Sequence, residues 1–389
     1  PLIEAKQGTG NAPAYRGLAY VVFERLPLDT FGNRIPLFQF EVLRTVGRLE
    51  SQIRAITVIP GSTEHGYSTV QVTESLGPGS VRTMNRHNLT HATDWAASID
   101  ELTAVCPNLE SVALVVSWFG TDLRAGHCRI LPGVETLGRE EESIPWIVSG
   151  IPRSDAHLIS TSNGGPAYGG TPNDASVVTA LADLKARGLK GFLYPFLMMD
   201  VPLGNGLPDP HGGAEQAVYP WRGRITCHPA PGRPGSPDRS AAIRTAVSAF
   251  CGDTAVGDFT VMGTEVTHTG TAQGYRRLVL HYAHLAKAVG GVDGFIIGSE
   301  LRGLTQLRDE TNAFPFVQAL VTLAGLEYAG IRSHPDPASR VIHAVIQGAL
   351  VGVGFLGAGI ILRDAATREV LNLTTAAAVW TTAVMGIAC

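Results

Sequence analysis

Two apolar segments of the sequence each end in an acidic residue, and two such carboxyl groups could act together in catalysis. Asp200 ends LKGFLYPFLMMD, and Glu300 ends GFIIGSE. Hydrolysis of a glycosidic bond commonly uses two carboxyl groups roughly 5 to 9.5 Å apart, one as the acid and the other as the nucleophile or base. Glu300 and Asp200 are therefore the predicted catalytic residues, with Glu300 as the principal candidate. The alternative for Glu300 is a strand-end ion pair with Arg302 or Arg276.

Two tryptophans and a further carboxylate could contact the substrate of such a site. Trp118 lies within the strand-like segment SVALVVSWFG, Asp122 follows that segment, and Trp221 lies in YPWRGRITC. Aromatic rings present flat apolar faces, which suit stacking on sugar rings. We therefore predict a substrate-binding role for Trp118, Asp122 and Trp221, with burial in the core as the alternative for the two tryptophans.

The remaining side chains give little support to metal, nucleotide or redox chemistry. His281 and His284 are spaced i, i+3 on a predicted helix, but no third ligand accompanies them, so no metal site is predicted. The five cysteines form no C-x-x-C pair, and neither a G-x-S-x-G elbow nor a P-loop is present. A formal charge of −4 and a pI near 6.3 give no reason to expect nucleic-acid binding. We predict no cofactor.

The elements that must position these side chains change in character along the chain. Residues 1–85 hold short apolar runs such as IRAITVIP between the turn signals FGN, PGST and GPGS, which predicts a β-rich module. From about residue 90 to 310, helix-like segments such as DASVVTALADLKARG precede buried strands such as LKGFLYPFLMMD. This alternation favours a parallel α/β arrangement. The Pro- and Gly-rich stretch 200–240 is long for a connection, as functional loops often are.

Two apolar segments follow residue 340. Residues 341–362 carry no formal charge, residues 371–389 are similarly apolar, and the polar link RDAATREV separates them. Each segment is long enough to cross a hydrocarbon core of about 30 Å at about 1.5 Å per residue. The two segments therefore predict a transmembrane helical hairpin.

The first apolar segment also contains Gly352-x-Gly354-x-x-Gly357, the spacing of a dinucleotide-binding loop. A true loop of this kind needs an acidic residue at the end of the next strand to bind the ribose, and here VLNLTT ends in threonine. We therefore interpret the glycines as the surface on which one membrane helix packs against another. This predicted packing surface comprises Gly348, Gly352, Gly354, Gly357 and Gly359.

Most of the chain resembles a known family. AYRGLAYVVFERLPLDTFGNRIPLFQFEV, NLESVALVVSWFGTDLRAGHC, GFLYPFLMMDVP, YPWRGRITC and VDGFIIGSELRGLTQLRD, in this order, are similar to the hub-like segment and the glycoside-hydrolase-like TIM-barrel domain of tail proteins of gene transfer agents and related siphophages. The resemblance spans residues 1–324. It implies that Glu300 stands where the fourth strand of many retaining glycosidase barrels carries the general acid. The late strand that would bring the second carboxylate is absent from the resemblance, which leaves Asp200 as its substitute.

A second resemblance covers residues 327–389. EYAGIRSH, GVGFLGAGIIL and LNLTTAAAVWTTAVMGIA are similar to segments of MgtC/SapB-type inner-membrane proteins, although Asn372 stands where that family commonly has Gly. This resemblance implies that Thr374, Thr375 and Trp380 pack in the second membrane helix. The two resemblances meet near residue 325, which indicates a gene fusion or a misassembled sequence.

Together these features predict an α/β chain in three parts: a β-rich hub-like module at 1–85, an incomplete TIM-barrel-like domain at 86–324 and a membrane segment at 325–389. The expected function is that of a phage-like tail or baseplate component whose barrel contacts cell-surface glycan. Its partners would be other tail and baseplate proteins, cell-wall or surface polysaccharide, and the lipid bilayer. The alternatives are a glycan hydrolase in the same setting and an inner-membrane protein with a fused soluble region. The chain would lie in the inner membrane if the hairpin inserts, and would otherwise assemble in the cytoplasm into a tail particle.

Overall fold

The computed structural model describes residues 45, 47–61, 63–139 and 141–330, scattered positions between 8 and 43, and the pairs 362–363 and 370–371. The chain divides into two compact units, Pro1–Arg44 and Thr45–Cys389. In the described part of the first unit, the 3-10 helix η1 (Asp29–Phe31) ends at Gly32, whose φ of 64° is a conformation that glycine adopts without strain. The predicted strand runs YRGLAYVVFERL and RIPLFQFEVLR lie mostly outside the described residues.

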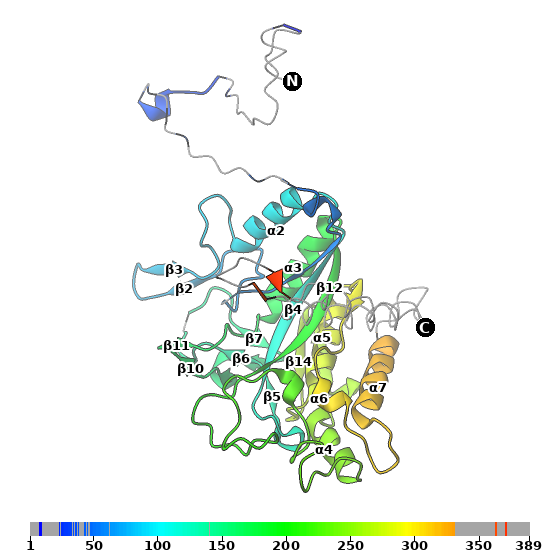
Figure 1. The fold of residues 1–389 in the computed structure, drawn as a ribbon. Helices are drawn as coiled ribbons and strands as arrows, with labels where there is room; N and C mark the ends of the chain where they lie inside the picture. Colours follow the sequence, from blue (N-terminus) through cyan, green and yellow to red (C-terminus); the bar gives the residue numbers. More distant parts are fainter. Residues whose placement is uncertain are drawn as a thin grey trace. The chain divides into compact units, whose positions relative to one another are not determined.

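A parallel sheet forms the centre of the second unit (Figure 1). Its strands, in spatial order, are β1 (Ala55–Val58), β4 (Ser111–Gly120), β12 (Lys190–Met199) and β15 (Gly294–Phe295), and β5 (Ile130–Leu131) pairs antiparallel with the end of β4. The longest pairing joins Ser111 with Lys190 and continues to Gly120 with Met199. The prediction of a mixed α/β fold with a parallel sheet is therefore confirmed. Over the described residues the sheet is open, with four parallel strands in its path.

Local signals in the sequence set the limits of the helices that pack on this sheet. α3 (Asp174–Ala186) begins after Asn173, whose side chain accepts a hydrogen bond from the backbone N–H of Ser176, and Gly188 follows its end with a φ of 75°. α2 (Asp94–Val105) is capped in the same way by Thr93. The helix α5 (Tyr275–Ala288) also packs on the sheet, but it begins after Gly274 without a side-chain cap. The helix predicted in DASVVTALADLKARG is confirmed.

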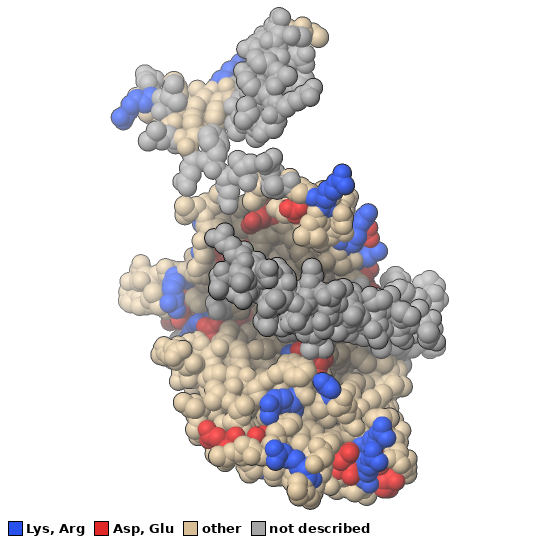
Figure 2. Space-filling model, in the orientation of Figure 1, with Lys and Arg blue, Asp and Glu red and all other residues tan. Residues whose placement is uncertain are grey.

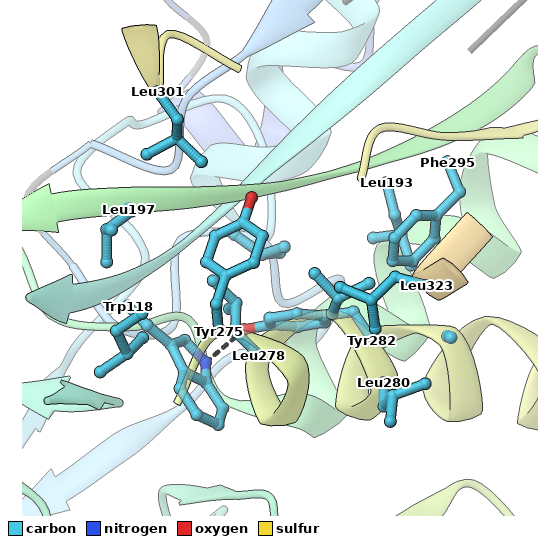
Figure 3. Close-up of a cluster of buried hydrophobic side chains, with 14 of the residues drawn as sticks. Trp118, Leu193, Leu197, Tyr275, Leu278, Leu280, Tyr282, Phe295, Leu301 and Leu323 are labelled. Atoms are coloured by element: carbon cyan, nitrogen blue, oxygen red, sulfur yellow. Dashed lines mark hydrogen bonds between the residues drawn. The ribbon is translucent and has the colours of Figure 1, made fainter. Parts of the chain in front are cut away.

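The side chains of β4 and β12 alternate between two faces of the sheet. One face belongs to the main hydrophobic core, in which Leu193 and Leu197 of β12 pack with Leu278 and Tyr282 of α5 (Figure 3). The opposite face, which we call the inner face, carries the smaller cluster of Val115, Tyr194, Phe196 and Ile296. In a TIM barrel the helices surround the outside, so the inner face corresponds to the barrel interior.

Short elements fill the connections between the central strands. The two-stranded pairs are β2 (Thr73–Ser75) with β3 (Val81–Thr83), β6 (Gly133–Val134) with β9 (His157–Leu158), β7 (Ile147–Val148) with β8 (Ile151–Pro152), β10 (Thr161–Ser162) with β11 (Gly165–Pro166), and β13 (Phe259–Met262) with β14 (Glu265–His268). The other α-helices of the described residues are α4 (Ala242–Cys251), α6 (Arg302–Thr305) and α7 (Pro315–Gly330). Among the described residues of the second unit, the 3-10 helices are η2 (Glu50–Gln52), η3 (Ala125–His127), η4 (Arg153–Asp155), η5 (Arg222–Arg224) and η6 (Val256–Asp258).

Two elements bear on the domain limits expected from the sequence. β1 falls within the predicted module of residues 1–85, yet it pairs with β4 and so belongs to the central sheet. α7 runs without a break through residues 324 and 325, where the barrel-like domain was expected to end. Phe316 and Leu323 of this helix are fully buried in the main core. Both elements therefore pack as parts of the second unit.

The predicted membrane segment lies almost entirely outside the described residues. This holds for the helices 341–362 and 371–389, and for Gly348, Gly352, Gly354, Gly357, Gly359, Thr374, Thr375 and Trp380. At the described positions, β16 (Leu362–Arg363) pairs antiparallel with β17 (Val370–Leu371), so Leu362 and Leu371 are extended where helix ends were predicted. Within the described part of the chain, no helix combines the length and the hydropathy needed to cross a bilayer. The hairpin and its resemblance to MgtC/SapB proteins stay predictions.

Candidate functional site

Glu300 and Trp221 meet at the carboxyl end of the central sheet. Glu300 follows β15, and Trp221 precedes η5 in the long loop 200–240. The indole Nε1 of Trp221 donates a hydrogen bond of 2.6 Å to Oε2 of Glu300. Trp221 is 39% exposed, whereas only 9% of the Glu300 side chain is exposed. The pair therefore offers a partly open aromatic ring with a carboxylate behind it.

Arg222 fixes this pair to the sheet. Its Nη2 lies 3.1 Å from Oε2 of Glu300, and its Nε donates a hydrogen bond of 3.1 Å to the carbonyl of Ser299. The guanidinium carbon lies 3.6 Å from the centre of the Phe196 ring on the inner face. Burial lowers the pKa of Arg222, and the charge of Glu300 opposes that shift. Arg222 thus connects the loop, the carboxylate and β12.

The backbone of Glu300 is held in an unusual conformation. Its φ is 57°, in the left-handed region that few residues other than glycine adopt. The preceding residue is anchored, because the hydroxyl of Tyr194 donates a hydrogen bond of 2.5 Å to Oγ of Ser299. Burial raises the pKa of Tyr194, which keeps this phenol a donor. Strained residues of this kind concentrate at functional sites, where surrounding contacts hold them in place.

A glycine supports the Trp221 ring. A methyl group added to Gly223 would lie 2.4 Å from the ring atoms of Trp221, well inside van der Waals contact. The indole therefore packs directly on the backbone of η5. This contact fixes the orientation of the exposed ring.

Asp200 belongs to a different hydrogen-bond network. Its carboxylate lies 2.7 Å from Nε2 of His157 and accepts hydrogen bonds from Oγ and N of Ser160 at 2.5 and 3.0 Å. The hydroxyl of Tyr219 lies 3.1 Å from the same Oγ. Burial alone would raise the pKa of Asp200, but the hydrogen bonds from His157 and Ser160 outweigh it and lower that pKa. Only 2% of the Asp200 side chain is exposed, so its carboxylate is enclosed by these partners.

Asp122 and Trp118 are also engaged by neighbouring side chains. Arg124 pairs with Asp122 at 2.6 Å, and Nε2 of Gln216 donates a hydrogen bond of 2.7 Å to the same carboxylate. Burial would raise the pKa of Asp122, but these hydrogen bonds lower it. Trp118 has no exposed surface, and its Nε1 donates a hydrogen bond of 3.2 Å to the hydroxyl of Tyr282 (Figure 3). Trp118 therefore lies in the core, as its alternative interpretation held, and has no surface that a ligand could contact.

The structure thus brings Glu300 and Trp221 together and places the other predicted site residues elsewhere. Glu300 does form an ion pair, but with Arg222; Arg276 donates instead to the carbonyl of Thr254. Arg222 was not predicted as a site residue, because no local pattern in the sequence shows that residues 78 positions apart, Arg222 and Glu300, form an ion pair. The available signal was its place next to Trp221 in a long loop.

The histidines spaced i, i+3 have separate partners. Nε2 of His281 lies 2.9 Å from Oδ1 of Asp174, and Nε2 of His284 donates a hydrogen bond of 3.1 Å to the carbonyl of Val256. Each ring is thereby fixed by an element that packs against α5. Among the described residues, the two do not form a shared ligand set with a third group.

Glu64, His65 and Glu142 do place ligand atoms within 4.8 Å of one another. Nη2 of Arg153 lies 2.7 Å from a carboxylate oxygen of Glu64 and 2.7 Å from one of Glu142. Nε2 of His65 lies 3.0 Å from the same oxygen of Glu142, and Arg139 pairs with Glu64 at 2.8 Å. The two guanidinium groups supply the positive charge that a metal ion would bring. We call these five residues the Arg153 network.

The segment that carries Glu300 is similar to a known protein family. A family model described as the GTA TIM-barrel-like domain, the barrel-like domain of gene transfer agents, matches residues 273–332, less than half of the chain. A search of curated proteins gave no match. The matched segment holds α5, β15, Glu300, α6 and α7, and it continues past residue 324 into the part that had been compared with MgtC/SapB proteins. Residues 273–332 are therefore similar to the TIM-barrel-like domain of gene transfer agents.

Proposed function

We propose that this chain is a component of a phage-like tail or baseplate, and that its barrel-like domain binds a glycan through Trp221. The observation that carries the proposal is the hydrogen bond that holds the partly exposed indole against Glu300. An indole face stacks on the apolar face of a sugar ring, and a neighbouring carboxylate accepts hydrogen bonds from sugar hydroxyls. Ligand sites of TIM barrels lie at the carboxyl end of the strands, where this pair is found.

The geometry favours binding over hydrolysis. A glycosidase needs a second carboxyl group that can reach the substrate. Asp200 is enclosed by His157 and Ser160 and its side chain is only 2% exposed, so its carboxylate is not free to act on a substrate as the nucleophile or base. Hydrolysis is the second candidate, and the strained backbone of Glu300 is the observation that favours it.

The tail setting is supported by the similarity of residues 273–332 to gene transfer agent proteins. Other tail and baseplate proteins would then be the protein partners. Figure 2 shows basic and acidic side chains interspersed over the described atoms of one face, without a continuous basic field there. Such a surface suits an uncharged polysaccharide better than the phosphate backbone of a nucleic acid.

The test compares wild-type protein with Trp221→Ala and Trp221→Phe in co-sedimentation with peptidoglycan sacculi and in titration with soluble polysaccharides. We expect Trp221→Ala to weaken binding about tenfold, which corresponds to roughly 1.4 kcal/mol of lost stacking and burial. Trp221→Phe keeps an aromatic face and should retain most of the affinity. Equal binding by all three proteins would contradict the role of Trp221.

Sugar release in the same samples decides between binding and hydrolysis. The proposal expects no reducing ends above background for the wild type or for Glu300→Gln. Release by the wild type that disappears in Glu300→Gln would establish the hydrolase instead. Glu300→Gln keeps the size of the side chain, so a loss of release would not follow from a lost contact surface.

A further inference from the structure

A cavity of about 550 Å³ lies at the carboxyl end of β1, in a part of the fold that the Trp221 site does not use. Its volume is within the range of small-molecule sites. The loop after β1, the β2–β3 hairpin and the first turns of α2 all contribute to its lining. The residues that matter most are Ile59, Met84, His87, Asp94, Ser98 and Arg139.

The apolar side of this cavity is fixed by contacts with the central sheet. The hydroxyl of Tyr67 lies 2.8 Å from the carbonyl of Val58 and 2.9 Å from that of Val115, which ties the lining to β1 and β4. Trp95 meets the Tyr67 ring edge-on with centroids 5.7 Å apart, and its Nε1 donates a hydrogen bond to Asp183 of α3. A cavity with walls held in this way needs little rearrangement to bind a ligand.

The polar side of the cavity is equally well ordered. Asp94 accepts a hydrogen bond of 2.6 Å from the backbone N–H of His87, and its other oxygen lies 2.7 Å from Nδ1 of the same residue. Across the lining, Arg139 pairs with Glu135 at 3.1 Å and also with Glu64. Hydrogen bonds from His87 hold the pKa of Asp94 below its usual range, against the effect of burial.

The charge pattern indicates the class of ligand. Asp94 and Glu135, the acidic groups of the lining, have their basic partners within it, and Arg82 of the lining pairs with Glu74 beside it. Because these charges are paired, neither a strongly anionic nor a strongly cationic ligand gains much net attraction. The same groups offer hydrogen-bond donors and acceptors side by side, next to the apolar surface of Ile59 and Met84. A neutral ring with several hydroxyl groups matches that combination.

We propose that the cavity at the carboxyl end of β1 binds a neutral saccharide, with its hydroxyls toward His87, Asp94 and Ser98 and an apolar edge toward Ile59. The site is separate from Trp221 and Glu300 and does not depend on the function proposed for them. It shares with them the carboxyl end of the parallel strands, where α/β proteins commonly bind ligands.

The test measures binding of N-acetylglucosamine and of glucose to the full chain by saturation-transfer NMR and calorimetry. Ser98 is an exposed position of α2 that also lines the cavity, so Ser98→Trp should obstruct it without disturbing the core. Glu101→Trp, exposed on the same helix and outside the lining, is the matched control. We expect at least one of the two sugars to bind, and to lose tenfold or more in affinity with Ser98→Trp and none with Glu101→Trp.

The remaining outcomes separate this site from the Trp221 site. Unchanged binding by Ser98→Trp, equal loss in both tryptophan variants, or no binding of either sugar by the wild type would each overturn the proposal. Binding lost in Trp221→Ala and kept in Ser98→Trp would support the Trp221 site and overturn the cavity. The reverse result would support the cavity, and the Trp221 site is then decided separately by the binding of sacculi and polysaccharides.

Discussion

Removing the guanidinium of Arg153 from the Arg153 network should destabilise the second unit strongly. In the wild type, Arg153 lies 2.7 Å from both Glu64 and Glu142, and its Nη1 donates a hydrogen bond to the carbonyl of Thr136. The exposed fractions are 7% for the Arg153 side chain, 0% for Glu64 and 4% for Glu142. Arg153→Met would therefore leave a buried carboxylate without its main counter-charge.

The magnitude follows from the partners that stay. Breaking a buried ion pair by removing one partner costs about 3 to 5 kcal/mol. Glu64 keeps Arg139 at 2.8 Å, whereas Glu142 keeps His65 at 3.0 Å and the backbone N–H of Trp146. We therefore expect a loss near the lower limit, about 3 kcal/mol. Adding Glu142→Gln to Arg153→Met removes the unpaired charge and should restore part of that loss.

Urea unfolding at pH 7 measures the effect. With a slope of about 3 kcal/mol per molar urea, the midpoint of Arg153→Met should fall by about 1 M. Arg54→Met is the control, because Arg54 and Glu110 form an ion pair that is 62% and 52% exposed and should contribute under 1 kcal/mol. A shift for Arg153→Met no larger than that of the control would refute the reasoning. So would a double variant that is no more stable than Arg153→Met.

Three further predictions concern pH, ring packing and thiol reactivity. Burial lowers the pKa of His284 from 6.5 to about 4, so below pH 6.5 the unfolded chain binds this proton more readily than the folded one. The free energy of unfolding should therefore be highest above pH 6.5 and fall as the pH falls toward 4, by at most about 1.4 kcal/mol per pH unit from this group. In denaturation at pH 7, 6 and 5, His284→Asn should lose less of its free energy of unfolding than the wild type does. Gly223→Ala should displace the indole of Trp221. In protein labelled with fluorotryptophan, the ¹⁹F resonance of Trp221 is identified as the one that Trp221→Phe lacks, and Gly223→Ala should shift it. A resonance that does not move would contradict the packing. Burial raises the pKa of Cys128 to about 12 and that of Cys251 to about 11, so iodoacetamide at pH 8 should label both in urea and neither in the folded chain, as peptide mapping would show.

Helices and strands were predicted well where the sequence carries a clear periodic pattern with a turn signal at its end. The helix α3 follows the apolar spacing of DASVVTALADLKARG and is followed by a left-handed Gly188, although its cap is Asn173, one residue before that segment. The strand β4 shows the limit of that approach. SVALVVSWFG is apolar on both faces, so its sequence does not tell which face meets the helices. Trp118 has the parity of Val112 and Leu114 and is buried with them, which is why it is unavailable to a ligand.

The candidate site was harder to predict, because its residues meet through contacts between segments that are far apart in the sequence. Asp200 was correctly placed at the end of β12, but its enclosure by His157 and Ser160 follows from the course of the connection between β5 and α3. No periodic pattern in the sequence predicts that course, because the elements there are only two or three residues long. Trp221 and Glu300 likewise meet through a long loop, in which Arg222 forms an ion pair with Glu300.

The continuity of α7 has a practical consequence for dividing the gene. A chain cut after residue 324 would end inside a helix, and the carbonyl groups of its last four residues would lose their intrahelical donors. One of those residues is Leu323, which is fully buried against the core. An expression boundary chosen at the apparent junction of the two resemblances would therefore expose unpaired backbone in a packed region. Expressing the barrel-like segment separately calls for a boundary after Gly330.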